Sequence, residues 1–156
     1  MHPNEQLIER FYQSFQKRDA DGMAACYHQD VLFSDPVFPD LRGDAARGMW
    51  RMLCARGKDL ELTFNAVRAD DSTGSAHWEA RYTFSGSGRK VHNTIDAQFE
   101  FRDGKIYRHE DQFDFWRWSR MALGPAGLLL GWTPILRNGV RKKAAKGLAD
   151  FMAKSR

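Results

Sequence analysis

The feature that most constrains the fold is a change in the spacing of apolar residues near residue 59. Up to that point they recur every three or four positions, which is typical of one face of a helix, and beyond it they alternate with polar residues, which is typical of strands. The first helical stripe consists of Leu7, Ile8, Phe11, Tyr12 and Phe15. The alternating residues are Leu60, Leu62, Phe64, Ala66, Trp78, Ala80, Tyr82 and Phe84. We therefore expect an α+β fold, with helices packed on one face of a curved antiparallel sheet.

Capping and turn residues divide these two regions into separate elements. The pattern predicts helices over residues 4–18, 23–27 and 45–56, the second after a turn at Asp19–Gly22 and the third capped by Asp44. A short strand over residues 31–35 is stopped by Pro36. Later strands are expected over residues 60–66, 78–84, 91–102 and 105–116, with hairpin turns at residues 85–88 and 103–104.

Length and composition indicate one folded domain without disulfide bonds. The chain has 156 residues, of which 42% are hydrophobic and 28% charged, so a disordered or collagen-like chain is excluded. Cys26 and Cys54 lack the spacing of a disulfide framework, and the N-terminus has no basic segment followed by an apolar one. We therefore expect a reducing, cytoplasmic location.

Charge is divided unevenly along the chain, although its net value is only +4. Residues 1–116 contain 15 Lys and Arg against 19 Asp and Glu, whereas residues 117–156 contain nine basic residues and one acidic residue. Residues 121–136 are 16 consecutive uncharged positions, too short and too rich in Gly and Pro for a membrane span. We expect residues 117–156 to form a C-terminal extension whose apolar segment is a lid, an arm exchanged with a second copy or an interfacial segment.

The extension is predicted to end in a basic amphipathic helix. Thr133 and Pro134 form a helix start. The apolar residues that follow at intervals of four are Leu136, Val140, Ala144, Leu148 and Met152. Most of the Lys and Arg lie off this stripe, so an anionic membrane surface is one candidate partner. The basic face carries no interleaved aromatic residues, which argues against nucleic acid as a partner.

A histidine and a carboxylate interrupt the aromatic face of the last predicted strand. His109 and Asp111 share this face with Tyr107, Phe113 and Phe115. Because an unpartnered imidazolium or carboxylate is costly to bury, each group must bond to another residue, to a metal or to a ligand in a cavity. The pair either orients the strands through a mutual hydrogen bond or belongs to a functional site.

The register of the central hairpin decides whether Asp96 joins this face. A turn centred on Ser87 pairs Trp78 with Asp96 and Tyr82 with His92, which places both polar residues inside. A slip of one residue would place them outside. We expect the inward register, because it keeps the rings of Trp78 and Tyr82 out of water.

Several short motifs, in their order along the chain, resemble the nuclear transport factor 2 superfamily and, within it, the SnoaL-like and ketosteroid isomerase-like branch. The motifs are Arg10-Phe-Tyr, Asp19-Ala-Asp-Gly22, Phe33-Ser-Asp-Pro-Val37, Leu41-Arg-Gly43, Gly88-Arg-Lys90, Ile95-Asp96 and Asp103-Gly-Lys-Ile106. The resemblance covers about residues 5–116. It implies a cone-shaped, strongly bent antiparallel sheet wrapped around three N-terminal helices, an apolar pocket at the open end and frequent homodimerisation. We expect residues 1–116 to form this SnoaL-like domain.

The resemblance also implies roles for individual residues. In ketosteroid isomerases a carboxylate before a proline is the general base, and Asp35 matches it, although an Asp-Pro pair is also typical of a simple turn. A protonated Asp, matched by Asp96, and a Tyr form the oxyanion hole of those enzymes. The Tyr position falls on Phe11, with Tyr12 beside it. In SnoaL-type cyclases an acidic residue of the last strand transfers a proton, and Asp111 occupies that place.

These patterns together predict cofactor-independent acid–base chemistry on a small hydrophobic molecule, as in an isomerase, a cyclase or a hydrolase. The alternative is a non-catalytic ligand-binding or dimeric assembly module. The candidate catalytic residues are Asp35, Asp96, His109 and Asp111. The candidate substrate-binding residues are Phe11, Tyr12, Phe15, Phe33, Trp78, Tyr82, His92 and Phe113. No cluster has metal-ligand spacing and no Gly-rich phosphate loop is present, so we expect neither a metal nor a cofactor.

Epoxide hydrolases of the same fold use an Asp–Arg–Asp set. The candidates for the arginine of this set are Arg81 and Arg108, and both are expected on the outer face of the predicted sheet. This activity is therefore less favoured than proton transfer by carboxylates alone.

Overall fold

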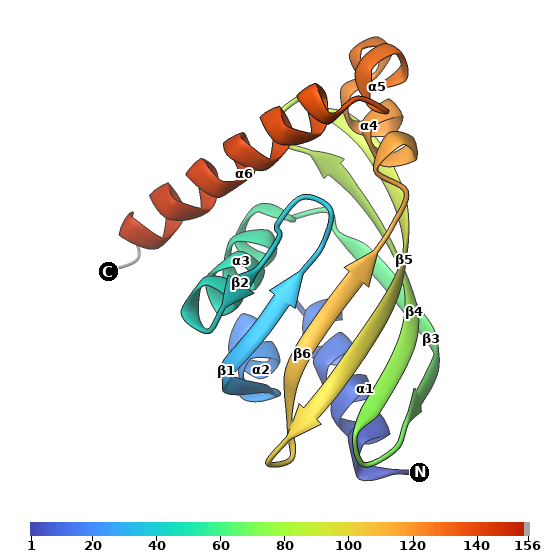
Figure 1. The fold of residues 1–156 in the computed structure, drawn as a ribbon, viewed down its shortest axis with the longest axis vertical. Helices are drawn as coiled ribbons and strands as arrows, with labels where there is room; N and C mark the ends of the chain where they lie inside the picture. Colours follow the sequence, from blue (N-terminus) through green and yellow to red (C-terminus); the bar gives the residue numbers. More distant parts are fainter. Residues whose placement is uncertain (155–156) are drawn as a thin grey trace.

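A six-stranded sheet curves around the three N-terminal helices, and the C-terminal helices cross its far end (Figure 1). The computed structural model describes residues 1–154. In chain order the elements are α1 (Pro3–Gln16), α2 (Ala20–Ala25), β1 (Tyr27–Ser34), β2 (Leu41–Arg42), α3 (Asp44–Arg56), β3 (Glu61–Ala69), β4 (Thr73–Phe84), β5 (Arg89–Arg102), β6 (Lys105–Gln112), α4 (Phe115–Leu123), α5 (Pro125–Leu130) and α6 (Pro134–Lys154). The predicted α+β class is confirmed.

The N-terminal helices form where the sequence predicts them, within a few residues. In α1, the His2 ring accepts a hydrogen bond from the Asn4 N–H, and Glu5 accepts one from the His2 N–H, so a capping box closes the first turn. Asp19 caps α2 by accepting the Gly22 N–H, and α2 therefore begins at residue 20 rather than at residue 23. The predicted apolar stripe of α1 is buried.

The strand order is β2-β1-β6-β5-β4-β3, and all neighbours are antiparallel except β1 and β6, which run parallel. The parallel pairing departs from the purely antiparallel sheet that we expected. It places Phe33 opposite His109 and Ser34 opposite Glu110. Asp35 follows β1 directly, so it lies beside the end of β6 that carries Asp111.

The register of the β4–β5 hairpin differs from the prediction by one residue. Phe84 pairs with Arg89 across a four-residue turn, so Trp78 lies opposite Ile95 and not opposite Asp96. Because side chains alternate between the two faces of the sheet, this shift of one residue moves every side chain of β5 to the face opposite the predicted one.

The expected inward placement of Asp96 and His92 is therefore wrong, and both side chains lie on the outer face of the sheet. Trp78 is buried in this register too, since the inner face of β4 does not depend on its partner. Burial of the rings thus could not decide the register. The turn does decide it: Gly88 adopts a positive φ of 73° and donates its N–H to the Phe84 carbonyl.

The last strand is shorter than predicted and contains a bulge. It ends at Gln112 rather than at residue 116, because Asp114 accepts the Arg117 N–H and caps α4. Tyr107 is an extra residue in the pairing of β6 with β5. The bulge changes the face of the preceding residue, so Ile106 is buried although Arg108 and Glu110, at even positions further along the strand, are exposed.

The long helix α6 crosses above α3 at the open end of the sheet (Figure 1). Leu148 is buried at this contact, and Met152 lies against Gly48, where an added Cβ would come within 2.8 Å of the Met152 sulfur. Val140 and Ala144 are half-buried. The predicted apolar stripe of the C-terminal helix therefore faces the rest of the chain.

Candidate active site

A cavity of about 440 Å³ lies between the concave face of the sheet, α3 and the C-terminal helices. Most of its wall is apolar and comes from α3, β4, β5, α6 and the residue after β6. The side chains that form this wall include Trp50, Trp78, Tyr82, Ile95, Phe113 and Val140. Its polar lining residues include Asp35, Arg56, Asn93, Asp111 and Lys143. An apolar cavity with a few convergent polar groups is the usual form of a small-molecule site.

Asp35 is fixed by the loop that follows β1. Its Oδ1 accepts hydrogen bonds from the backbone N–H groups of Val37, at 2.7 Å, and Phe38, at 2.6 Å. Burial is the main cause that raises the pKa of Asp35 to about 7, and the negative charge of Asp111 acts in the same direction, against the opposing effects of the two backbone hydrogen bonds and of Arg141. The predicted Asp-Pro turn is therefore present, and it holds Oδ1 of a carboxylate that lines the cavity.

Asp111 belongs to a buried chain of hydrogen bonds. Its Oδ1 lies 2.9 Å from His109 Nε2 and accepts the indole N–H of Trp78 at 3.3 Å. At the other side of the ring, His109 Nδ1 lies 2.7 Å from the Tyr27 hydroxyl, which also accepts the indole N–H of Trp50 at 2.8 Å. His109 and Asp111 are 1% and 3% exposed, so the mutual partners replace water for both groups.

This chain defines which ring nitrogen of His109 carries a proton. The indole of Trp50 can only donate, so the Tyr27 oxygen accepts there and its own proton is directed to His109 Nδ1. Nδ1 is then an acceptor, and Nε2 carries the proton that is donated to Asp111. The arrangement satisfies every donor and holds the Asp111 carboxylate through its Oδ1.

A second hollow, of about 460 Å³, reaches the same two carboxylates from another side. Asp35, Asp111 and Phe113 line both spaces. The remaining wall of the hollow is more polar and includes Arg137 and Arg141 of α6. Asp35 therefore has an apolar space on one side and a polar space on the other.

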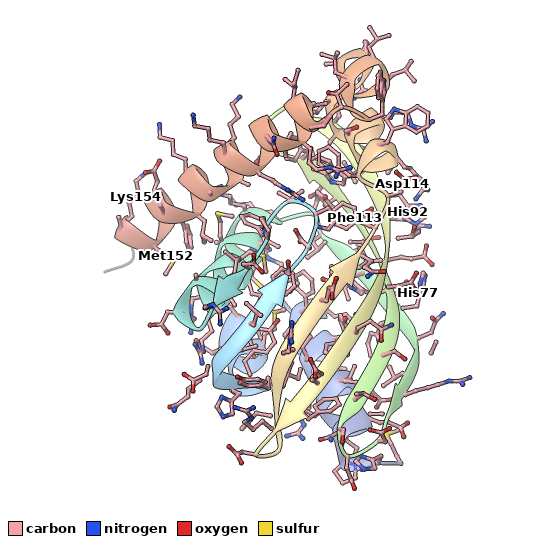
Figure 2. All side chains as sticks on the ribbon, in the orientation of Figure 1. His77, His92, Phe113, Asp114, Met152 and Lys154 are labelled. Carbon is pink, nitrogen blue, oxygen red and sulfur yellow. The ribbon has the colours of Figure 1, made fainter. Side chains whose placement is uncertain are left out.

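The outer face of the sheet holds a separate polar cluster instead of a part of the site. His77 Nδ1 lies 2.9 Å from Asp96, and Glu79 bridges His77 and His92 at 3.3 Å and 2.8 Å. The hydrogen bond to Asp96 is the main cause of a raised pKa for His77, and that from His92 lowers the pKa of Glu79. Figure 2 shows His77 and His92 on the side of the sheet away from the helices. Within residues 1–154 no three such ligands converge as a metal site.

The predicted substrate-binding residues divide into three groups. Those that line the cavity are Phe15, Trp78, Tyr82 and Phe113. Those buried in the core behind it are Phe11, Tyr12 and Phe33. His92 lies outside. Of the four predicted catalytic residues, Asp35 and Asp111 line the cavity, His109 supports Asp111 from the core, and Asp96 is remote.

Tyr12 occupies no oxyanion-hole position. Its hydroxyl is buried without a hydrogen-bond partner among the described residues, and burial raises its pKa well above the ordinary value. Phe11 stacks on Tyr27 with a ring separation of 5.2 Å and contacts the edge of His109 at 5.4 Å. Both residues of α1 therefore pack beneath the polar chain.

Sequence reasoning missed three contributors to the site. Trp50 is on the inner face of α3 and Tyr27 begins β1; their hydroxyl–indole bond could not be found without the tertiary fold. The apolar run around Met49 was a signal for Trp50, since an indole in mid-helix is rarely left in water. Arg141 donates to the Pro36 carbonyl at 2.8 Å, although it was expected on the solvated face of the basic helix.

Several solved structures share this fold at low sequence identity. An NTF2-like protein of unknown function from Burkholderia pseudomallei is 19% identical, with a TM-score of 0.67, covering 78% of this chain and 98% of that one. An LEH-like epoxide hydrolase from M. tuberculosis is 21% identical, with a TM-score of 0.66 and coverage of 82% and 96%. TerC, co-crystallized with polyporic acid, is 20% identical, with a TM-score of 0.66 and coverage of 77% and 98%. At these identities the likeness establishes the fold alone.

The family itself follows from the sequence. A search of the curated proteins finds no match. The SnoaL-like domain model matches residues 8–109, which include most of α1, the Asp35 loop and most of β6. The chain therefore belongs to the SnoaL-like domain family and has the NTF2-like fold.

Proposed function

We propose that the cavity binds a small, mostly apolar molecule and that Asp35 takes a proton from it or returns one to it. The observation that carries this proposal is the position of Asp35, whose carboxyl group lines an apolar cavity, where burial raises its pKa to about 7. A general base is most effective when its pKa lies near the working pH, because it is then both ionised and able to hold the proton. Asp35 meets this condition without a cofactor.

The geometry supports a division of roles between the two carboxylates. Asp35 Oδ1 is held by two backbone N–H groups, so Oδ2 is the oxygen that meets a bound molecule. Asp111 Oδ1 is held by His109 and Trp78, and its charge favours proton uptake by Asp35. Asp35 thus exchanges the proton, and Asp111 is a fixed negative charge beside it.

Removal of a proton from carbon leaves negative charge on the bound molecule, which needs hydrogen-bond donors. Tyr82 lines the cavity, and its hydroxyl accepts the indole N–H of Trp118 at 2.9 Å, so its own proton remains for a ligand. Asn93 also lines the cavity, and its side-chain amide can donate two hydrogen bonds. We assign these two donors to an oxygen of the substrate on which charge develops.

Activation of water is a second candidate reaction. The polar hollow beside Arg137 and Arg141 offers water a path to Asp35 that does not cross the apolar cavity. Hydrolysis of a bound molecule would then need the same base, and the M. tuberculosis neighbour is described as an epoxide hydrolase. Both reactions depend on Asp35, so one experiment tests what they share.

The test uses 5-nitrobenzisoxazole, an apolar probe that a single base opens. The carboxylate removes the ring C–H proton, the N–O bond breaks, and a coloured cyanophenolate forms. The protein is expected to exceed free acetate in rate by about a hundredfold or more. The rate should rise with pH around a midpoint of about 7, because only ionised Asp35 is a base.

The matched variants are Asp35→Asn and Asp96→Asn, which make the same chemical change inside the cavity and on the outer face. The first should abolish the acceleration, and the second should retain it. Equal rates for wild type and Asp35→Asn would contradict the proposal. Quenching of tryptophan fluorescence measures binding of the probe. Binding without any acceleration of the reaction would indicate a ligand-binding module instead.

A further inference from the structure

We propose that the C-terminal helices dock on the surface of an anionic lipid bilayer. The basis is an apolar patch formed by α5 and the residues after it, Leu128, Leu129, Leu130, Trp132 and Ile135, which are between 51% and 84% exposed. Apart from Met1 and Trp116, these are all the exposed large hydrophobic residues in the part of the chain that is described. Such a concentration on a single corner is typical of an interaction surface.

The structure holds this patch outward. Gly127 lies so close to the Ser119 carbonyl that no larger residue fits, which packs α5 against α4 on its other side. The indole of Trp116 donates to the Leu128 carbonyl at 3.2 Å, and that of Trp132 donates to the Leu129 carbonyl at 3.0 Å. The leucines are therefore presented by an ordered corner and cannot turn inward without breaking these contacts.

Positive charge is concentrated in the part of the chain that carries the apolar patch. From residue 115 to residue 149 the chain contains no Asp or Glu. The basic residues of this stretch are Arg117, Arg120, Arg137, Arg141, Lys142, Lys143 and Lys146, and none forms an ion pair within residues 1–154. Figure 2 shows nitrogen-tipped side chains that project from α6 away from the sheet, and branched carbon side chains that project from the outer side of α5.

An anionic bilayer complements both parts of this surface. Its acyl region accepts leucines and its interface accepts indoles such as Trp132, while its phosphates attract exposed lysines of α6 such as Lys142 and Lys146. No helix among the described residues is long and apolar enough to cross a membrane, so the contact is peripheral. The indole of Trp132 is 69% exposed, which is the placement expected of an interfacial anchor.

A second copy of the chain is a poorer occupant of the same surface. A twofold contact through α5 would bring two sets of basic residues together without acidic partners, and like charges oppose that contact. Nucleic acid would satisfy the charge but would leave the aliphatic leucines in water, because base stacking uses aromatic side chains. The bilayer alone provides for the apolar and the basic groups together.

The experiment is co-sedimentation of the full chain with vesicles of phosphatidylcholine alone or with about one third phosphatidylglycerol. Binding is expected only to the anionic vesicles and should weaken as salt is raised. Leu129→Glu should abolish it by placing a charge in the apolar patch. The pair Lys142→Glu with Lys146→Glu should weaken it by at least about tenfold.

The matched control is the pair Lys17→Glu with Arg81→Glu, which changes net charge equally at two exposed positions outside the C-terminal helices. It should bind vesicles almost as wild type does. Circular dichroism of each variant verifies that the fold is retained. Binding that Leu129→Glu leaves intact would overturn the proposal. So would a protein that ignores vesicles and forms a dimer which Leu129→Glu dissociates. The outcome does not depend on acid–base chemistry in the cavity.

Discussion

Asp35 and Asp111 line one cavity from the ends of two adjacent parallel strands, and the charge of Asp111 helps to hold the pKa of Asp35 at about 7. The relationship depends on β1 pairing with β6, which no local motif predicts. It makes Asp35 a group whose protonation responds to pH near neutrality and to any substitution of its neighbour.

Asp35→Asn should change how stability depends on pH. The pKa of Asp35 is raised on folding, so its contribution to stability is complete below about pH 4 and is lost as pH rises through about 7. Wild type should therefore lose stability over this interval with an extra slope of at most about 1.4 kcal/mol per pH unit, which Asp35→Asn removes. Asn still accepts the Val37 and Phe38 N–H groups. Urea unfolding of both proteins at pH 5 and pH 8 checks the difference, and parallel pH profiles would contradict it.

Two tyrosine-to-phenylalanine changes should differ in their effect on stability. Tyr27→Phe strands the buried Trp50 N–H and His109 Nδ1, and it should lower the free energy of unfolding by about 2–3 kcal/mol. Tyr12→Phe removes a buried hydroxyl that has no described partner, and it should be neutral or stabilising. Chemical denaturation measures both, and a large loss in the second variant would mean that the Tyr12 hydroxyl is bonded.

Asp96→Asn should lower the pKa of His77 without affecting the cavity. The raised pKa of His77 comes mainly from its hydrogen bond to Asp96, so the stability it contributes is present at low pH and is lost as pH rises through that pKa. Because these groups are partly exposed, the loss should be below about 1 kcal/mol. NMR titration of the ring protons follows His77 directly, and an unchanged titration midpoint would exclude this cause.

Leu148→Ala should loosen α6 from α3. The side chain is 4% exposed at that contact, and truncation of a buried leucine costs about 2–5 kcal/mol. Since α6 is a terminal element, the effect should appear as local opening, with faster proteolytic cleavage in residues 134–154 than in the sheet. Uniform cleavage of both regions would show instead that α6 unfolds together with the core.

The fold was predictable because its elements have strong local signals. The stripe of α1 and the alternation in β4 specify their faces without tertiary information. The register of β5 was not predictable, because it depends on whether the turn after Phe84 contains an odd or an even number of residues. The end of β6 was not predictable either. The apolar alternation continues to residue 116, but Asp114 caps α4 and the strand ends at Gln112.

The site was predictable only in part, for the same reason. His109 and Asp111 could be paired from their spacing on one strand, and the pairing is confirmed. Asp96 was misplaced because a one-residue step reverses the faces of a strand. Tyr27 and Trp50 complete the chain of hydrogen bonds from distant elements, and neither has a sequence pattern that distinguishes it from an ordinary core residue.

The C-terminal helices form one side of the cavity, through Leu123, Val140 and Lys143. All three follow residue 109, where the SnoaL-like match ends. Replacement of the C-terminal helices would therefore change this side of the cavity without altering the part of the chain that matches the family model. A chimera with the C-terminal segment of another family member would have a different cavity wall opposite Asp35 and Asp111.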